Sequence, residues 1–156
     1  LVRWIPPIHG ICLNVDGASK GNPGPSGGGG CFRNSSSDIL LAFAFNYGFG
    51  TSLQAEVRAL HDGLHMAEEF VNSINSKSAL GWQCHRWWHA ALIAFHKQAS
   101  NIVHVFGEAN QVADALASIG CQEPMNRIFT SFSMLPHVVK GPAVLDKTGL
   151  PNVRFV

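Results

Sequence analysis

The feature that most constrains the fold is an acidic residue at the end of an apolar run near the N-terminus. Residues 11–16 read ICLNVD, and a segment rich in glycine and proline, residues 17–25, follows at once. A short apolar run bounded by turn residues is typical of a buried strand. We therefore predict a strand that carries the carboxylate of Asp16 to its tip. A carboxylate held at a rigid strand end is a natural ligand for a hard cation such as Mg²⁺.

The segments that follow predict an antiparallel meander. Residues 27–33 and 39–46 read as two further strands, separated by a polar turn. Residues 27–30 are all glycine, which weakens the second strand by propensity. Glycine in a strand also permits close approach of another backbone or of a ligand, and both interpretations stay open.

Helical spacing of apolar residues predicts three helices after the meander. The first covers residues 53–70 with Ser52 as its cap, and the second runs from about residue 77 to 99. Residues 101–106 then alternate as a strand does, and Asn110 caps a short last helix that Gly120 ends. The residues expected in the core of the first helix are Leu53, Val57, Leu60, Leu64 and Ala67, and those of the last are Val112, Ala113, Leu116 and Ala117.

Composition indicates one folded domain. The chain has 156 residues, of which 46% are hydrophobic and only 13% are charged, so a core can form. The net charge of +1 does not by itself indicate a nucleic-acid partner. No acid occurs between Glu69 and Glu108, whereas three cations do: Lys77, Arg86 and Lys97. This stripe either attracts phosphates locally or is an ordinary solvated helix face.

The remaining patterns place the chain in broad classes. The four cysteines form no C-x-x-C pair, which suits buried thiols in a reducing compartment. Without a signal peptide or a membrane-spanning run, we expect an intracellular protein, nuclear or cytoplasmic, that is not secreted and has no membrane partner. Residues 1–10 are expected as an extended lead-in, 11–121 as the domain, and 122–156, which hold four prolines, as an irregular tail.

Three motifs together resemble the ribonuclease H family, in its reverse transcriptase-like form from plant retroelements. They are NVDGA with KGNPGP at residues 14–25, QAEVRAL at 54–60 and EANQVADALA at 108–117. They occur in the order of the family and span about residues 4 to 121. The resemblance implies a mixed sheet that begins with three antiparallel strands, continued by helix, helix, strand and helix.

The resemblance also implies an activity and a site. It makes Asp16, Glu56 and Asp114 catalytic residues and ligands of Mg²⁺, or of Mn²⁺. The implied reaction is hydrolysis of the RNA strand of an RNA–DNA hybrid, which leaves a 3′-hydroxyl and a 5′-phosphate. The residues that would contact nucleic acid are Gly17, Lys20, Asn22, Ser52, Gln54, Arg86 and Asn110. The oligomeric state is left open.

One departure from the family bears on both fold and activity. Relatives carry a strand with a fourth carboxylate between the two long helices, but here residues 67–70 lead directly into residues 71–77. We therefore expect an internal deletion near residues 70–71, a sheet without its usual fourth strand, and impaired activity. Either residues 101–106 pair with the first strand, or residues 70–74 form a makeshift one. Asp62 does not replace the acid, because it points about 120° away from Glu56 around the helix.

Other functions are less well supported by the sequence. Residues 24–28 fit G-x-S-x-G, but glycines follow the serine where a nucleophile elbow needs a helix. The two His pairs at i, i+4 have no intervening Glu and no obvious third zinc ligand. The main alternative to the enzyme is an inactive descendant, a nucleic-acid-binding or protein-interaction module left by a retroelement.

Overall fold

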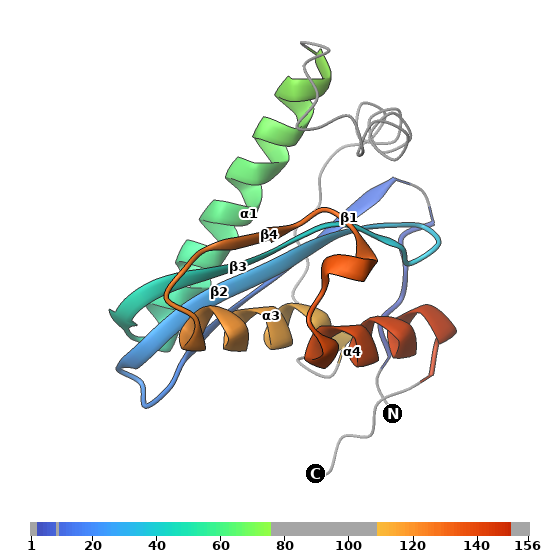
Figure 1. The fold of residues 1–156 in the computed structure, drawn as a ribbon. Coiled ribbons are helices and arrows are strands. Elements are labelled where there is room, and N and C mark those ends of the chain that lie inside the picture. The colour runs from blue at the N-terminus through green and yellow to red at the C-terminus, as the bar shows by residue number, and fades with distance from the viewer. Residues whose placement is uncertain (1–2, 9, 76–108, 151–156) are drawn as a thin grey trace.

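The computed structural model describes residues 3–8, 10–75 and 109–150, and these form a sheet with helices on both faces (Figure 1). The sheet has four strands in the order β1-β2-β3-β4, and all neighbours are antiparallel. Its strands are β1 (Ile11–Ser19), β2 (Gly24–Asn34), β3 (Ile39–Gly50) and β4 (Arg127–Phe129). The helices are α1 (Ser52–Asn75) on one face, and α3 (Gln111–Gln122) and α4 (His137–Thr148) on the other, with a 3₁₀ turn, η3 (Phe132–Met134), before α4. The predicted mixed α/β fold and its antiparallel meander are confirmed.

Two predicted elements lie outside the described residues: the helix at residues 77–99 and the strand at 101–106. Within the described residues, no strand pairs with the second edge of β1. The missing fourth strand therefore stays a prediction. Residues 70–74 form no makeshift strand, because α1 continues through them to Asn75. They contain neither glycine nor proline to end the helix.

Alternation along the strands gives the sheet one apolar cluster on each face. The larger cluster lies under α3 and α4 and includes Cys31, Ala42, Val112, Leu116, Phe129 and Val139. The smaller one lies under α1 and includes Phe32, Leu41 and Ala67, with Leu13 and Met66 packed against it.

Helix α1 buries a different face from the one that its sequence predicts, except at Ala67, which is buried as predicted. Leu53 and Val57 are 74% and 62% exposed, and Leu60 and Leu64 are exposed too. The helix instead turns its small residues, Ala55, Ala59, Gly63 and Ala67, toward the sheet. The reason is the closeness of the two backbones: a Cβ at Gly17 would lie 2.2 Å from the carbonyl carbon of Ala55. Leucines on this face would hold the helix too far from β1.

The glycines of β2 admit a helix backbone rather than a ligand. A Cβ at Gly29 would lie 2.3 Å from the backbone nitrogen of Ala117, and one at Gly27 would lie 2.4 Å from that of Cys121. Gly120 has the same role and does not end the helix, since α3 continues to Gln122. A Cβ at Gly120 would lie 2.3 Å from the backbone oxygen of Phe45. The predicted helix stop at this glycine is therefore wrong.

Replacing Gly29 with alanine should lower the free energy of unfolding by about 1–3 kcal/mol, because α3 has to move away from the sheet. The matched control is Gly141→Ala in α4, where an added Cβ meets nothing within 4 Å. This control should change the free energy of unfolding by less than about 1 kcal/mol, because the helix preference of alanine is offset by crowding of its Cβ against the following Pro142. Urea unfolding followed by circular dichroism measures both. Equal effects of the two substitutions would contradict the packing role of Gly29.

The segment expected to be an irregular tail is ordered up to residue 150. β4 pairs with β3, so that Phe129 lies opposite Ala42, and Val139 and Ala143 of α4 enter the larger core cluster. The prolines that suggested irregularity fit into these elements: Pro136 precedes α4, and Pro142 lies within it. Burial of an apolar face outweighs the local effect of proline here. Within the described residues, no helix has the length and apolarity that crossing a membrane requires.

Candidate active site at Asp16

Asp16 and Glu56 meet at one backbone N–H group. The amide of Gly17 donates to Asp16 Oδ1 at 3.0 Å and to Glu56 Oε2 at 3.2 Å. Glu56 reaches this position because α1 lies so close to Gly17, where only glycine leaves room for the backbone of Ala55. The two carboxylates, 40 residues apart in the chain, are thus held side by side.

The start of α1 is fixed by two sets of hydrogen bonds. Thr51 and Gln54 form a capping box: Thr51 Oγ1 accepts from the Gln54 amide, and Gln54 Oε1 accepts from the Thr51 amide. The cap is therefore Thr51 and not the predicted Ser52, and the T-x-x-Q pattern in the sequence could have indicated it. The amide of Ser52 donates instead to Asn22 Oδ1 at 2.9 Å. These bonds set the position of Glu56 one turn further on.

Asp114 enters the same site from the opposite layer. It lies in the first turn of α3, and its backbone amide donates to the backbone oxygen of Asn110 at 3.0 Å. The side chain of Asn110 in turn donates to the backbone oxygen of Val15 at 2.9 Å. The first turn of α3 is thereby attached to β1 directly before Asp16.

The three acids leave negative charge without compensation. Burial, repulsion from Glu56 and Asp114, and a hydrogen bond with Glu56 raise the pKa of Asp16 from 3.8 to about 7. Within the described residues, no ion pair contains any of these three acids. Nor do three acidic, histidine or cysteine side chains there lie close enough to share an ion in their present positions. Glu56 and Asp114 are exposed, so their side chains can turn toward a cation.

The residues predicted to contact nucleic acid lie in different environments. Lys20, Asn22 and Gln54 are exposed and lie near the end of β1 and the start of α1, which carry Asp16 and Glu56. Ser52 is half-buried. Gly17 belongs to the acidic cluster itself, and Asn110 is only 8% exposed. Arg86 lies outside the described residues.

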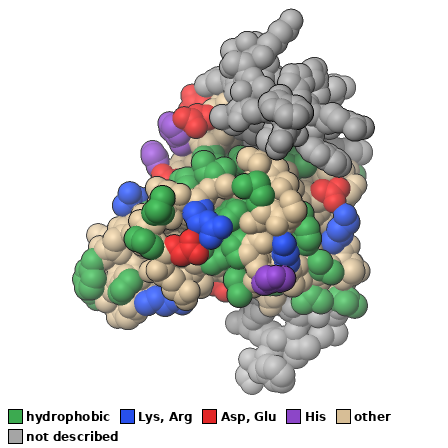
Figure 2. All heavy atoms as spheres, in the orientation of Figure 1, with side chains coloured by type: hydrophobic (Ala, Val, Ile, Leu, Met, Phe, Trp, Pro, Cys, Tyr) green, Lys and Arg blue, Asp and Glu red, His purple; other side chains and the backbone are tan. Residues whose placement is uncertain are grey.

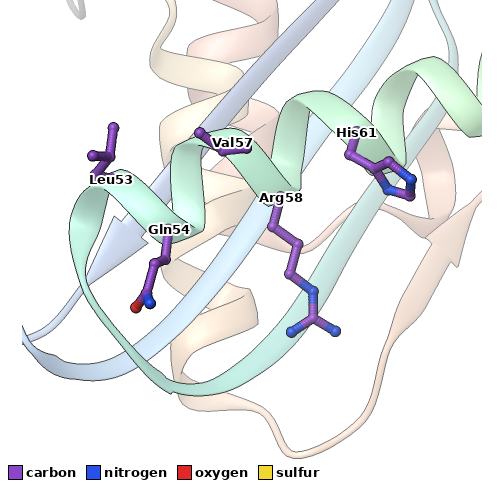
Figure 3. A pocket seen from close by; sticks show the side chains of 5 residues that line it. All are labelled: Leu53, Gln54, Val57, Arg58 and His61. Carbon is purple, nitrogen blue, oxygen red and sulfur yellow. The ribbon is translucent and has the colours of Figure 1, made fainter.

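A shallow hollow on the exposed side of α1 lies apart from the acids. Its lining consists of Leu53, Gln54, Val57, Arg58 and His61, of which Gln54 and Arg58 extend to the same side of the helix (Figure 3). The guanidinium of Arg58 lies 4.5 Å from the centre of the Tyr47 ring, whose hydroxyl donates to Asp62 at 2.8 Å. Asp62 is thus engaged away from Asp16, in agreement with its predicted position on the helix.

The face of the molecule that carries α4 and β4 is not a basic surface. In Figure 2, Lys and Arg side chains alternate with acidic and hydrophobic ones over the described part of this face. The described part of this face therefore offers a polyanion no broad positive patch.

Comparisons with known proteins agree with this fold. Residues 14–71 match the reverse transcriptase-like family. A protein of Arabidopsis thaliana named as a ribonuclease H protein is 27% identical over the whole chain, which spans 27% of the length of that relative. The fold resembles LC11-RNase H1 in complex with RNA/DNA hybrid (TM-score 0.50, 22% identity, 72% of this chain and 96% of that one). It also resembles the N-terminal RNase H domain of a Mycobacterium tuberculosis protein (TM-score 0.51, 24% identity, 73% and 94%).

Fold and comparisons together show a ribonuclease H-like fold. Residues 14–71 are similar to the reverse transcriptase-like family, so the resemblance predicted from the motifs is confirmed.

The comparisons give one observation in favour of the predicted missing strand and one against it. The alignment with the Arabidopsis protein runs over 178 positions, 22 more than the 156 residues of this chain, so the relative has additional residues. The two solved domains, however, are matched over 96% and 94% of their own lengths. Neither observation locates a deletion at residues 70–71.

Proposed function

We propose that this domain binds RNA–DNA hybrids and cuts their RNA strand with the help of a divalent cation. The observation that carries the proposal is the convergence of Asp16, Glu56 and Asp114: burial, together with repulsion from the other two acids, raises the pKa of Asp16 to about 7. The half-buried carboxylate of Asp16 has no cationic partner in the described residues, so its ionisation is costly unless a ligand compensates the charge. In a ribonuclease H-like fold, the ligand that best fits this chemistry is a hard divalent cation.

The donor set suits Mg²⁺ or Mn²⁺, both of which prefer oxygen ligands. Asp16, Glu56 and Asp114 would hold it. When bound, the cation would supply Lewis-acid activation of a water molecule and neutralise charge on the scissile phosphate. The protein's own part is positioning: β1 holds Asp16 rigidly, and the Gly17 amide orients the carboxylates of Asp16 and Glu56 toward each other.

The substrate would lie across the exposed residues next to the acids. Lys20 offers a charge to a phosphate, and the amide NH₂ of Asn22 would donate to one while its Oδ1 accepts from the Ser52 amide. Gln54, Ser52 and, from the sequence, Arg86 would extend this surface. Selectivity for the RNA strand would come from contacts to its 2′-hydroxyl groups.

A binding module without turnover is the second candidate. It is favoured by the carboxylate count, because three acids converge in the described residues and they do not close around a common point. Two-cation hydrolysis needs more charge compensation than three open carboxylates supply. We therefore expect slow cleavage at best, with hybrid binding retained.

A cleavage assay with a labelled RNA–DNA hybrid tests the proposal. The purified protein should cut the RNA strand in Mg²⁺ or Mn²⁺ and should not cut it in EDTA. Matched RNA–RNA and DNA–DNA duplexes should stay intact, since the first lacks the DNA strand and the second lacks 2′-hydroxyl groups. Tight hybrid binding with no cut product in either metal would favour the binding module, and the absence of both would overturn the two candidates together.

A further inference from the structure

The side chain of Asn110 has one satisfied end and one unsatisfied end. Its Nδ2 donates to the backbone oxygen of Val15, whereas its Oδ1 has no hydrogen-bond partner within the described residues. The residue is 92% buried, since only 8% of its surface is exposed. A buried carbonyl oxygen without a partner costs about 1–3 kcal/mol, and native structures rarely keep one without a functional reason.

The orientation of this amide is fixed by its partner. Exchanging Oδ1 and Nδ2 would set two acceptors, Oδ1 and the oxygen of Val15, against each other. Oδ1 also makes no bond to the N–H groups at the start of α3, although Asn110 occupies the cap position there. The side chain of Asn110 therefore does not cap α3 but lies against β1, where it bonds to Val15.

Among the described residues, no hydrogen bond from a neighbouring group reaches Oδ1. Val15 offers a carbonyl oxygen, Asp16 follows directly in β1, and Asp114 lies one turn along α3. The nearby Gly17 amide already serves Asp16 and Glu56. A water molecule or a cation can satisfy such an acceptor, and beside three carboxylates a cation, or a water bound to it, also compensates the negative charge.

We propose that Asn110 Oδ1 supplies the acidic site with a fourth oxygen donor, to a divalent cation or to one of the waters that the cation keeps. The neutral amide would thus take part of the role of the fourth carboxylate that the sequence predicts to be missing. The inference rests on the proposed function, because it requires that the three acids bind a cation. It also gives Asn110 a role inside the site rather than on the nucleic-acid surface.

Titration of Mn²⁺ into the metal-free protein, followed by calorimetry, tests the inference without any cleavage assay. Asn110→Ala should weaken Mn²⁺ binding by about tenfold or more, as loss of a ligand or of its supporting group does. Asn110→Asp keeps one oxygen in place and should bind Mn²⁺ more tightly than Asn110→Ala, although its second oxygen opposes that of Val15 and should lower the melting temperature of the metal-free protein. Asn126→Ala is the matched control, because Asn126 Oδ1 accepts from the Asn46 amide away from the acids, and its Mn²⁺ affinity should be unchanged.

A second readout separates binding from damage to the fold. The rise in melting temperature caused by Mn²⁺ should shrink in Asn110→Ala, whereas a purely structural role would lower the melting temperature equally with and without the metal. Equal Mn²⁺ affinity in Asn110→Ala and wild type, or equal losses in Asn110→Ala and Asn110→Asp, would overturn the inference and leave the proposed function intact. A wild-type protein that binds no Mn²⁺ would overturn both.

Discussion

Replacing Asp146 with alanine should lower the free energy of unfolding by about 3–5 kcal/mol, a large part of the stability of a domain of this size. Asp146 Oδ2 accepts from Arg33 Nη1 at 2.6 Å, and the two side chains are only 2% and 1% exposed. Without the carboxylate, the guanidinium of Arg33 would keep its full charge in the interior.

The other partners of Arg33 cannot take over this compensation. Asn14 Oδ1 accepts from Nε and Nη2 of Arg33 at 3.1 and 2.8 Å, and the Trp4 ring lies 3.7 Å from its guanidinium carbon. Both contacts involve neutral groups. The network joins the N-terminal segment, β1, β2 and α4, so its loss should detach α4 from the sheet before the sheet itself unfolds.

Lys147→Ala is the matched control, in the next residue of the same helix. Lys147 pairs with Asp38 at the surface, where its side chain is more than half exposed, and such pairs contribute about 0–1 kcal/mol. The double variant Arg33→Met, Asp146→Leu should recover most of the lost stability, because it removes the buried charge as well. Urea unfolding measures all three. If Asp146→Ala lowered the free energy of unfolding no more than Lys147→Ala does, water would have to solvate the guanidinium of Arg33 in the variant, and the prediction would be wrong.

Asp16→Asn should abolish cleavage and at the same time stabilise the metal-free protein. Cleavage should fall at least about 100-fold, since loss of a cation ligand removes several kcal/mol of transition-state stabilisation. The gain in stability has a separate cause. Because its folded pKa is about 7 and its ordinary value is 3.8, the Asp16 carboxylate opposes folding increasingly as the pH rises through this range.

The stabilisation should therefore depend on pH. Below about pH 4 the carboxyl is protonated in both the folded and unfolded states, so the amide should have little effect. Above pH 7 the substitution should add about 1–2 kcal/mol, a value reduced from the full shift because Asp16 is partly exposed to water. Melting curves in EDTA at pH 5 and pH 8 measure the difference.

Glu68→Gln provides the control for charge alone, since it removes an exposed carboxylate from the same helix as Glu56. It should change neither cleavage nor the pH dependence of the melting temperature. If Asp16→Asn were destabilising at pH 8 in EDTA, the buried charge of Asp16 beside the other two acids would not oppose folding, as its raised pKa implies. Full cleavage by this variant would remove Asp16 from the site.

Local patterns in the sequence were sufficient for the order of elements and for the acidic residues. Strand alternation, turn residues and helical spacing depend on a few neighbouring positions, and the meander, α1 and α3 lie close to where these patterns predict them. One difference is that β1 continues to Ser19, so Asp16 lies within the strand and not at its tip. The motifs around Asp16, Glu56 and Asp114 likewise identified three acids that the fold brings together. The capping box at Thr51 could also have been read from four consecutive residues.

Contacts between distant segments decided the rest. No local pattern shows that Gly17 brings the backbone of α1 so close that its alanines, and not its leucines, face the sheet. The C-terminal helix α4 is ordered because Asp146 pairs with Arg33, 113 residues away in the chain. Likewise, Asn110 Oδ1 is removed from water only when α3 packs against β1. Such partners are set by the packing of layers in space, because burial creates the need for a charge or hydrogen-bond partner only after the chain has folded.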